Sequence, residues 1–178
     1  WRGTKAGDGG GALMNQGIHS VDLLLWIMGD VKSVSAYKNN LTHDIEVEDT
    51  VTAAVEFVSG AMGSIQATTS VHHGIDKCLE IYGEQGTVIV HGETVTMWEF
   101  KDGVAEDGDT IQSRQSLSAQ SPLIEDVWGH RQQIMDMIRA IREDKEPLIS
   151  GRDGLKAVEL VQAIYESART GKTVDLYK

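Results

Sequence analysis

The sequence predicts an α+β fold in which helices pack on one face of an open, mainly antiparallel sheet. Two observations support this prediction. Apolar residues recur with a helical period near both ends of the chain, whereas they alternate with polar residues in parts of the middle, from about residue 32 to 100. The strand-like segments follow one another through short links, and because parallel strands need long crossovers, these links predict an antiparallel meander.

The first predicted helix covers residues 15–28. Val21, Leu25 and Met28 fall on one side of it at the roughly 100° step of an α-helix, and Gly29 follows where a C-terminal cap belongs. Residues 1–14 are polar and rich in glycine, which predicts a tight turn that leads into this helix.

The middle of the chain is predicted to form the sheet. Its apolar and polar residues alternate most clearly over 51–58, and Ser59-Gly60 then turns the chain back. The expected strands are residues 34–39, 51–58, 63–71, 76–82, 87–90 and 94–98. Residues 101–120 are polar, and we expect them to form a loop or an irregular sheet edge.

Two more helices are predicted near the C-terminus. Ser121 and Pro122 provide an N-cap and a first helical residue, and Pro147 separates the first of these helices from the second. Gly171 is expected to end the second helix, and residues 173–176 to add an edge strand.

The second face of the predicted sheet carries small side chains rather than the lysines and glutamates of a typical wet surface. Its members are Thr52, Ala54, Ser64, Gln66, Thr68 and Ser70. A flat face of this kind suits association of one sheet with another, so we expect a homo-oligomer joined through it. An ordinary solvated sheet face is the alternative.

The composition describes a globular chain that needs no disulfides. Its 178 residues include 16 Lys and Arg against 27 Asp and Glu, a formal net charge of −11, which argues against a nucleic-acid partner. The single Cys78 excludes an internal disulfide framework and a zinc site with several cysteines. No apolar run approaches the roughly 20 residues of a membrane span, and no targeting signal is visible, so we expect a cytoplasmic protein without a membrane partner.

The first helix also carries residues that can perform chemistry. With Asn15 as origin, the helical step puts Asp22 at about −20°, Trp26 at about 20° and His19 at about 40°. A histidine titrates near neutral pH, a carboxylate beside it can fix its tautomer, and an amide can hold a substrate hydroxyl. By spacing alone, a surface or interdomain hydrogen-bonded pair is the commoner explanation, and proton transfer is the alternative.

The glycine run offers a weaker signal for a cofactor. Gly7, Gly9 and Ala12 formally fit the dinucleotide fingerprint, but residues 1–6 are not a hydrophobic strand and no βαβ unit follows. We therefore expect a turn here and no cofactor-binding residue.

An acidic segment precedes the strand at 51–58. It contains His43, Asp44, Glu46, Glu48 and Asp49. We expect a solvated loop, with cation binding as the alternative, and we predict no metal site in the chain.

Several motifs resemble the C-terminal domain of Gfo/Idh/MocA oxidoreductases. The start of that domain is similar to residues 1–4, 8–19 and 22–26 of this chain, and its end to residues 130–148, Gly151, residues 154–157 and residues 163–168. The resemblance covers nearly the whole chain, and the segment from Asp8 to His19 is its more specific part.

The resemblance implies a single substrate-binding and oligomerisation domain over residues 1–178, preceded in the full-length protein by a Rossmann domain that binds NAD or NADP. Members of this family transfer a hydride between nicotinamide and a carbinol carbon of a sugar, polyol or related hydroxy compound. A lysine of a Glu-Lys-Pro motif in the first domain assists, and Lys145-Glu146-Pro147 has a different order. We therefore expect residues 1–178 alone to lack activity and tight dinucleotide binding.

The resemblance also assigns individual residues. It implies that His19 is the catalytic acid/base, with Asn15 and Asp22 beside it, and that Trp1 and Arg2 line the substrate site together with Asn15 and His19. Asn15 stands where many members carry an aspartate, which removes a charge from the site. The alternative function is a non-catalytic dimerisation or ligand-sensing module of the same fold, which the sequence upstream of Trp1 would distinguish.

Overall fold

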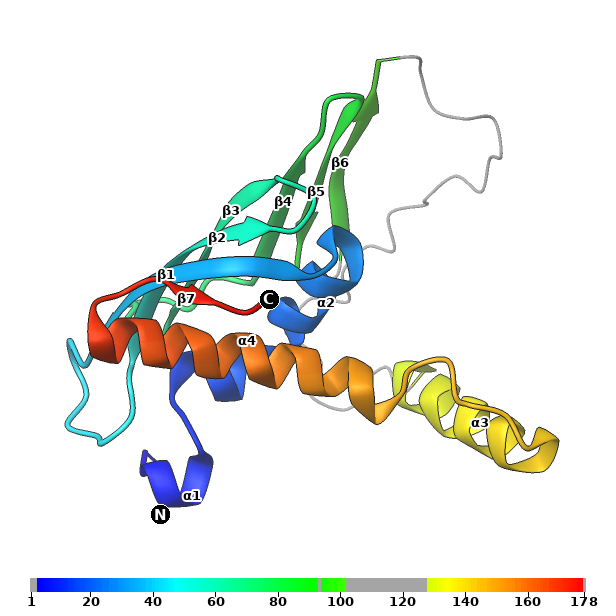
Figure 1. Cartoon of the computed structure of the whole chain (residues 1–178), viewed down its shortest axis with the longest axis horizontal. Helices are drawn as coiled ribbons and strands as arrows, with labels where there is room; N and C mark the ends of the chain where they lie inside the picture. Colours follow the sequence, from blue (N-terminus) through cyan, green and yellow to red (C-terminus); the bar gives the residue numbers. More distant parts are fainter. Residues whose placement is uncertain (1–2, 93, 102–127, 178) are drawn as a thin grey trace. The chain divides into compact units, whose positions relative to one another are not determined.

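The computed structural model describes residues 3–92, 94–101 and 128–177. The chain divides into two compact units, which we call unit 1 (Trp1–Ile75 and Ile149–Lys178) and unit 2 (Asp76–Leu148). The elements are α1 (Lys5–Asp8), a π-helical turn η1 (Leu13–Gly17), α2 (Ile18–Met28), β1 (Val31–Asn39), β2 (Thr50–Phe57), β3 (Met62–Thr68), β4 (Cys78–Tyr82), β5 (Gly86–His91), β6 (Thr94–Phe100), α3 (Trp128–Glu143), α4 (Gly151–Thr170) and β7 (Val174–Asp175). Figure 1 labels all of them except η1.

The strands form two open antiparallel sheets, which confirms the predicted fold class. Unit 1 contains a four-stranded sheet in the order β3-β2-β1-β7, and unit 2 contains a three-stranded sheet in the order β4-β5-β6. The sequence had suggested one continuous meander, but β3 and β4 do not pair with each other. Residues 69–77 separate them without a regular alternation, and His73 adopts a positive φ of 59° there.

The core of unit 1 lies between α4, α2 and one face of the four-stranded sheet, along which α4 runs in Figure 1. Alternate residues of the strands point into it, as the period-2 pattern of residues 51–58 predicts. The most deeply buried apolar side chains, each at most 2% exposed, are Leu13, Val21, Val34, Val51, Ala53, Phe57, Ala157, Leu160, Val161 and Ile164.

Helix α4 is fixed at both ends and against β1. Ser150 and Asp153 form a capping box at its start, and Gly171, with a φ of 67°, ends it as predicted. Near its end the buried Ser167 accepts a hydrogen bond from Ala36 N at 3.0 Å and donates one to Lys172 O at 2.7 Å. These bonds hold the C-terminal half of α4 on the sheet.

The opposite face of the four-stranded sheet is exposed in the chain. Ser35, Ala54 and Ser64 lie side by side across β1, β2 and β3, and Tyr37, Thr52 and Gln66 form the next row. All six residues are exposed, and Tyr37 is 82% exposed. Five of these residues are small or polar, as the sequence predicts, whereas Tyr37 adds a large aromatic side chain to the face.

The described residues of unit 2 bury much less apolar surface than those of unit 1. In the part of this unit that the structure describes, Ala140 on α3 is buried, whereas Ile134 and Ile141 on the same helix are 61% and 73% exposed. The structure confirms the predicted helix from Trp128 on, whereas its predicted start at Ser121 and Pro122 lies outside the described residues. The apolar stripe of α3 has no cover among the described residues. Of the helices that the structure describes, none is long and apolar enough to cross a membrane.

Candidate functional site

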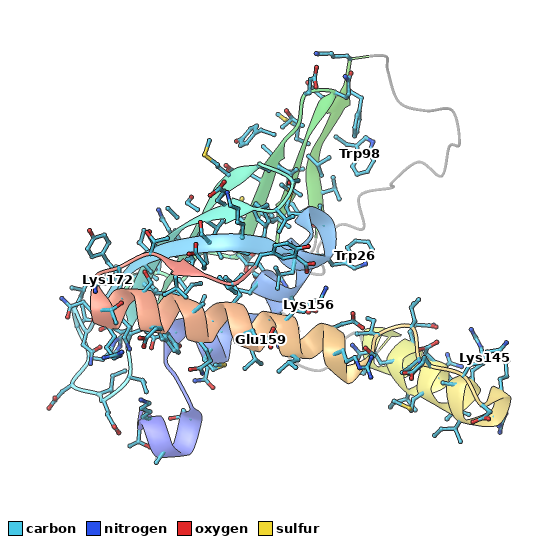
Figure 2. All side chains as sticks on the ribbon, in the orientation of Figure 1. Trp26, Trp98, Lys145, Lys156, Glu159 and Lys172 are labelled. Atoms are coloured by element: carbon cyan, nitrogen blue, oxygen red, sulfur yellow. The ribbon has the colours of Figure 1, made fainter. Side chains whose placement is uncertain are left out.

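The predicted site residues share the exposed side of the first helical segment. Asn15, His19, Asp22 and Trp26 are all exposed, whereas Val21 is 2% exposed and belongs to the core. Trp26 is 82% exposed, and Figure 2 shows its side chain pointing away from the ribbon of α2. The structure therefore presents the whole predicted stripe to solvent.

The sequence predicts one uniform α-helix over residues 15–28, but the structure has two kinds of helical turn there. Residues 13–17 form the π-helical turn η1, which carries Asn15, and the α-helix α2 begins only at Ile18. A π turn is wider than an α turn, so Asn15 departs from the 100° step used to align it with His19. Short π segments inside helices occur frequently at functional sites.

The amide of Asn15 is oriented by the glycine turn before it. Its Nδ2 donates to Gly10 O at 2.6 Å and to Gly11 O at 3.3 Å. An amide NH2 has two hydrogens, and two carbonyl oxygens can only accept, so the flip state of the side chain is fixed. The amide oxygen Oδ1 is the atom with which Asn15 can contact a ligand, and it can only accept a hydrogen bond.

His19 and Asp22 follow one turn apart on α2, but no hydrogen bond joins them in the described part of the chain. His19 and Asp22 therefore lie near each other on one exposed stripe without a hydrogen bond between them. Trp1 and Arg2, the other predicted substrate-binding residues, lie outside the described residues.

A buried carboxylate that sequence reasoning missed lies beneath this turn. Glu48 is 2% exposed, and its Oε2 and Oε1 accept hydrogen bonds from Gly11 N at 3.0 Å and Leu13 N at 3.1 Å. Oε1 also accepts from Tyr165 Oη at 2.8 Å. Burial and this hydrogen bond to Glu48 together raise the pKa of Tyr165, so the phenol is protonated at neutral pH and donates.

The neighbouring Asp49 is also buried, with no exposed surface. Its carboxylate accepts hydrogen bonds from the backbone N–H groups of Leu41, Thr42 and His43 at 2.9–3.0 Å, and it lies 3.2 Å from His43 Nδ1. Burial by itself would raise the pKa of Asp49, but the hydrogen bonds outweigh it and hold the pKa far below its usual range.

The expectation of a solvated acidic loop is therefore wrong for Glu48 and Asp49. Both carboxylates are buried because they satisfy backbone N–H groups that would otherwise lack acceptors. The signal was their position: they lie between buried Val47 and the start of β2, where a solvated pair is out of place. Among the described residues, no group of three or more His, Cys, Asp or Glu side chains is arranged to hold a metal ion.

Close packing explains the glycine run. A Cβ on Gly11 would lie 1.8 Å from the backbone oxygen of Glu48, and one on Gly10 would lie 2.5 Å from Tyr165 Oη. The N–H groups of Gly11, Ala12 and Leu13, which a phosphate cradle would need, all donate to Glu48 instead. The run is thus a turn packed against the chain's own carboxylate.

Comparison with known proteins places this geometry in a family. Residues 1–176 match the model of the oxidoreductase family C-terminal alpha/beta domain. A D-apiose dehydrogenase from Rhizobium rhizogenes is 30% identical over 172 residues, which is 90% of this chain and 47% of that protein.

Solved structures agree. The WlbA dehydrogenase from Bordetella pertussis, in complex with NADH and UDP-GlcNAcA, has a TM-score of 0.81 and 37% identity, covering 100% of this chain and 49% of that chain. The WlbA dehydrogenase from Chromobacterium violaceum, in complex with the same two molecules, has a TM-score of 0.82 and 39% identity, covering 99% and 49%. The chain thus spans about half the length of the relatives it matches. With its family match over residues 1–176, this chain belongs to the Gfo/Idh/MocA oxidoreductases, whose C-terminal alpha/beta domain it matches.

Proposed function

We propose that this chain binds the substrate and supplies the acid/base group in a nicotinamide-dependent dehydrogenase that acts on a sugar, polyol or related hydroxy compound. The observation that carries the proposal is the exposed stripe of Asn15, His19 and Asp22 on a helical segment whose start is held by a buried carboxylate. Membership of an oxidoreductase family supports it.

In the proposed reaction His19 removes the hydroxyl proton from the carbon that is oxidised. The hydride of the same carbon would pass to NAD or NADP bound to the full-length protein, so that the alcohol would become a carbonyl compound. Asn15 Oδ1 accepts a hydrogen bond from a neighbouring hydroxyl of the substrate, because the single proton of the reacting hydroxyl goes to His19 and Asn15 Nδ2 already donates to the glycine turn. Asp22, on the same exposed stripe, stabilises the imidazolium that forms. Trp1 and Arg2 complete the proposed substrate site.

The dinucleotide is proposed to bind mainly to a Rossmann domain outside these residues. The N–H groups of the glycine turn are engaged by Glu48, and the net charge of −11 gives phosphates no general attraction. Residues 1–178 alone are then expected to show no tight binding of NAD or NADP in a calorimetric titration; micromolar affinity for either would contradict this.

The first substrates to test follow from the relatives. The two WlbA dehydrogenases, 37% and 39% identical to this chain, are in complex with UDP-GlcNAcA, and the D-apiose dehydrogenase is 30% identical. UDP-GlcNAcA and D-apiose, each with NAD and NADP, therefore come first in an assay of the full-length protein.

The deciding experiment is His19→Ala in the full-length protein, with His72→Ala as control. Loss of a general acid/base lowers kcat by at least about tenfold while the Kd for the cofactor stays within about twofold. His72 is an exposed loop histidine in unit 1, and its removal leaves kcat unchanged. A wild-type kcat in His19→Ala would reject the acid/base role, and a wild-type protein inactive on every hydroxy compound would favour a non-catalytic module.

We also propose that the outer face of the four-stranded sheet joins two copies of the chain. Ala54 is at the middle of this face, and Arg there would place a charge against its own symmetry mate. Arg at position 68 would also disturb hydrogen bonds within the chain, because the Thr68 hydroxyl binds Thr50 Oγ1 at 2.9 Å and accepts from Ser70 N at 3.0 Å. Ala54 is therefore the better position for the substitution. Sedimentation should show a dimer or larger for the wild type and a monomer for Ala54→Arg; a monomeric wild type would refute the proposal.

A further inference from the structure

We infer that Glu48 is a positioning residue for the site: it holds the glycine turn that orients Asn15 and leads into the helix of His19. The inference rests on the proposed function for its effect on turnover. Glu48 itself is buried, so it acts through the turn and not on the substrate.

Glu48 engages three consecutive backbone N–H groups. Gly11 N donates to its Oε2 at 3.0 Å, Leu13 N to its Oε1 at 3.1 Å, and Ala12 N, between them, to its backbone oxygen at 2.9 Å. These are N–H groups at the start of a helical segment, which have no acceptor within the helix and which favour a negative charge. Glu48 thus caps the segment from a position 35 residues away from Leu13.

The same turn sets the side chain of Asn15. Asn15 Nδ2 binds the carbonyl oxygens of Gly10 and Gly11, and Asn15 N binds Gly11 O at 2.9 Å. Gly11 therefore binds Glu48 through its N–H group and Asn15 through its carbonyl. A shift of Gly11 moves the amide of Asn15 directly, and the π turn transmits it to His19.

The carboxylate is itself held in place. Tyr165, on α4, donates to Glu48 Oε1 at 2.8 Å, and Lys38 Nζ on β1 lies 4.7 Å from the centroid of the Tyr165 ring. Gln at position 48 would keep the size of the side chain but turn one acceptor into an NH2 group facing an N–H donor. The effect of Glu48→Gln is therefore on the hydrogen bonds of the turn and not on packing.

The test is Glu48→Gln in the full-length protein, with Glu46→Gln as the matched control. Glu46 is an exposed acid two residues away whose Oε2 accepts from Lys5 N at 3.0 Å. Misplacement of reacting groups predicts a kcat that falls about tenfold to a hundredfold in Glu48→Gln, with the KM for the cofactor within about twofold. A kcat equal to that of Glu46→Gln would overturn the inference.

A double-mutant cycle separates positioning from a general loss of stability. If Glu48 acts through Asn15, Glu48→Gln adds little to the kcat loss of Asn15→Ala, whereas independent effects would multiply and contradict the inference. Where Glu48→Gln does not fold, Tyr165→Phe replaces it in the same cycle. Losses in kcat from Tyr165→Phe and Asn15→Ala that multiply would then contradict the inference.

A second readout does not depend on turnover. Hydrogen exchange of the Gly11 and Leu13 amides should accelerate in Glu48→Gln and stay unchanged in Glu46→Gln. If His19→Ala keeps its kcat, the proposed function fails, while unchanged exchange in Glu48→Gln shows separately that Glu48 does not hold the turn.

Discussion

Glu48 and Asp49 are adjacent, both buried and both bound to backbone N–H groups, yet they stabilise different kinds of structure. Asp49 accepts from Leu41, Thr42 and His43, residues six to eight positions away, and so closes the loop before β2. Glu48 accepts from residues 35, 37 and 117 positions away, and so joins the glycine turn to α4. Burial of an acidic side chain therefore does not indicate which parts of the chain it joins, whereas the sequence distance to its hydrogen-bond donors does.

The largest expected effect on stability is that of Glu48→Ala. This substitution removes the acceptor of three donors, Gly11 N, Leu13 N and Tyr165 Oη. Each buried group left unsatisfied costs about 1–3 kcal/mol of folding free energy. We expect the free energy of unfolding in urea to fall by about 3 kcal/mol or more. Glu46→Ala, the exposed control, should change it by less than about 0.5 kcal/mol. Equal values for the two variants would show that Glu48 does not tie the turn to α4.

Asp49→Asn should be less severe, because Asn keeps one oxygen that can accept from the N–H groups of Leu41, Thr42 and His43. The pKa of Asp49 is lowered by folding, so its ionised form stabilises the native state above the unfolded pKa of about 3.9, and this contribution is lost as pH falls below that value. We expect Tm to drop by about 5 °C at pH 7.

The difference in Tm between wild type and Asp49→Asn should depend on pH. The gap in Tm between wild type and Asp49→Asn should shrink as the pH falls below about 4. His43→Ala serves as control, because it removes one side-chain contact of Asp49 and keeps the backbone N–H of residue 43. A gap that stays constant down to pH 3 would contradict the account of Asp49.

Tyr165→Phe should have the smallest effect of the three. It removes one O–H donor and leaves Glu48 with both of its backbone donors, so we expect a loss of about 0.5–1 kcal/mol in chemical denaturation. A loss as large as that of Glu48→Ala would mean that Tyr165, rather than the glycine turn, is the main partner of Glu48.

The sequence could predict features that repeat along the chain. The period-2 pattern of β2, the cap at Gly171 and the exposed positions of His19 and Asp22 on α2 all follow from local spacing. The π turn could not be predicted, because no local pattern distinguishes it from an α-helix. Neither could the role of Glu48, because its partners are 35 to 117 residues away and a hydrogen bond across such a distance leaves no periodic trace.

The donor Nδ2 of Asn15 already faces two backbone carbonyl oxygens, those of Gly10 and Gly11. With both hydrogens engaged, the side chain offers a ligand only an oxygen that accepts, as a carboxylate does. Asn15 therefore accepts hydrogen bonds as an aspartate would, without the negative charge of an aspartate. In the proposed substrate site, the neutral acceptor of residue 15 does not repel an anionic ligand such as a sugar acid.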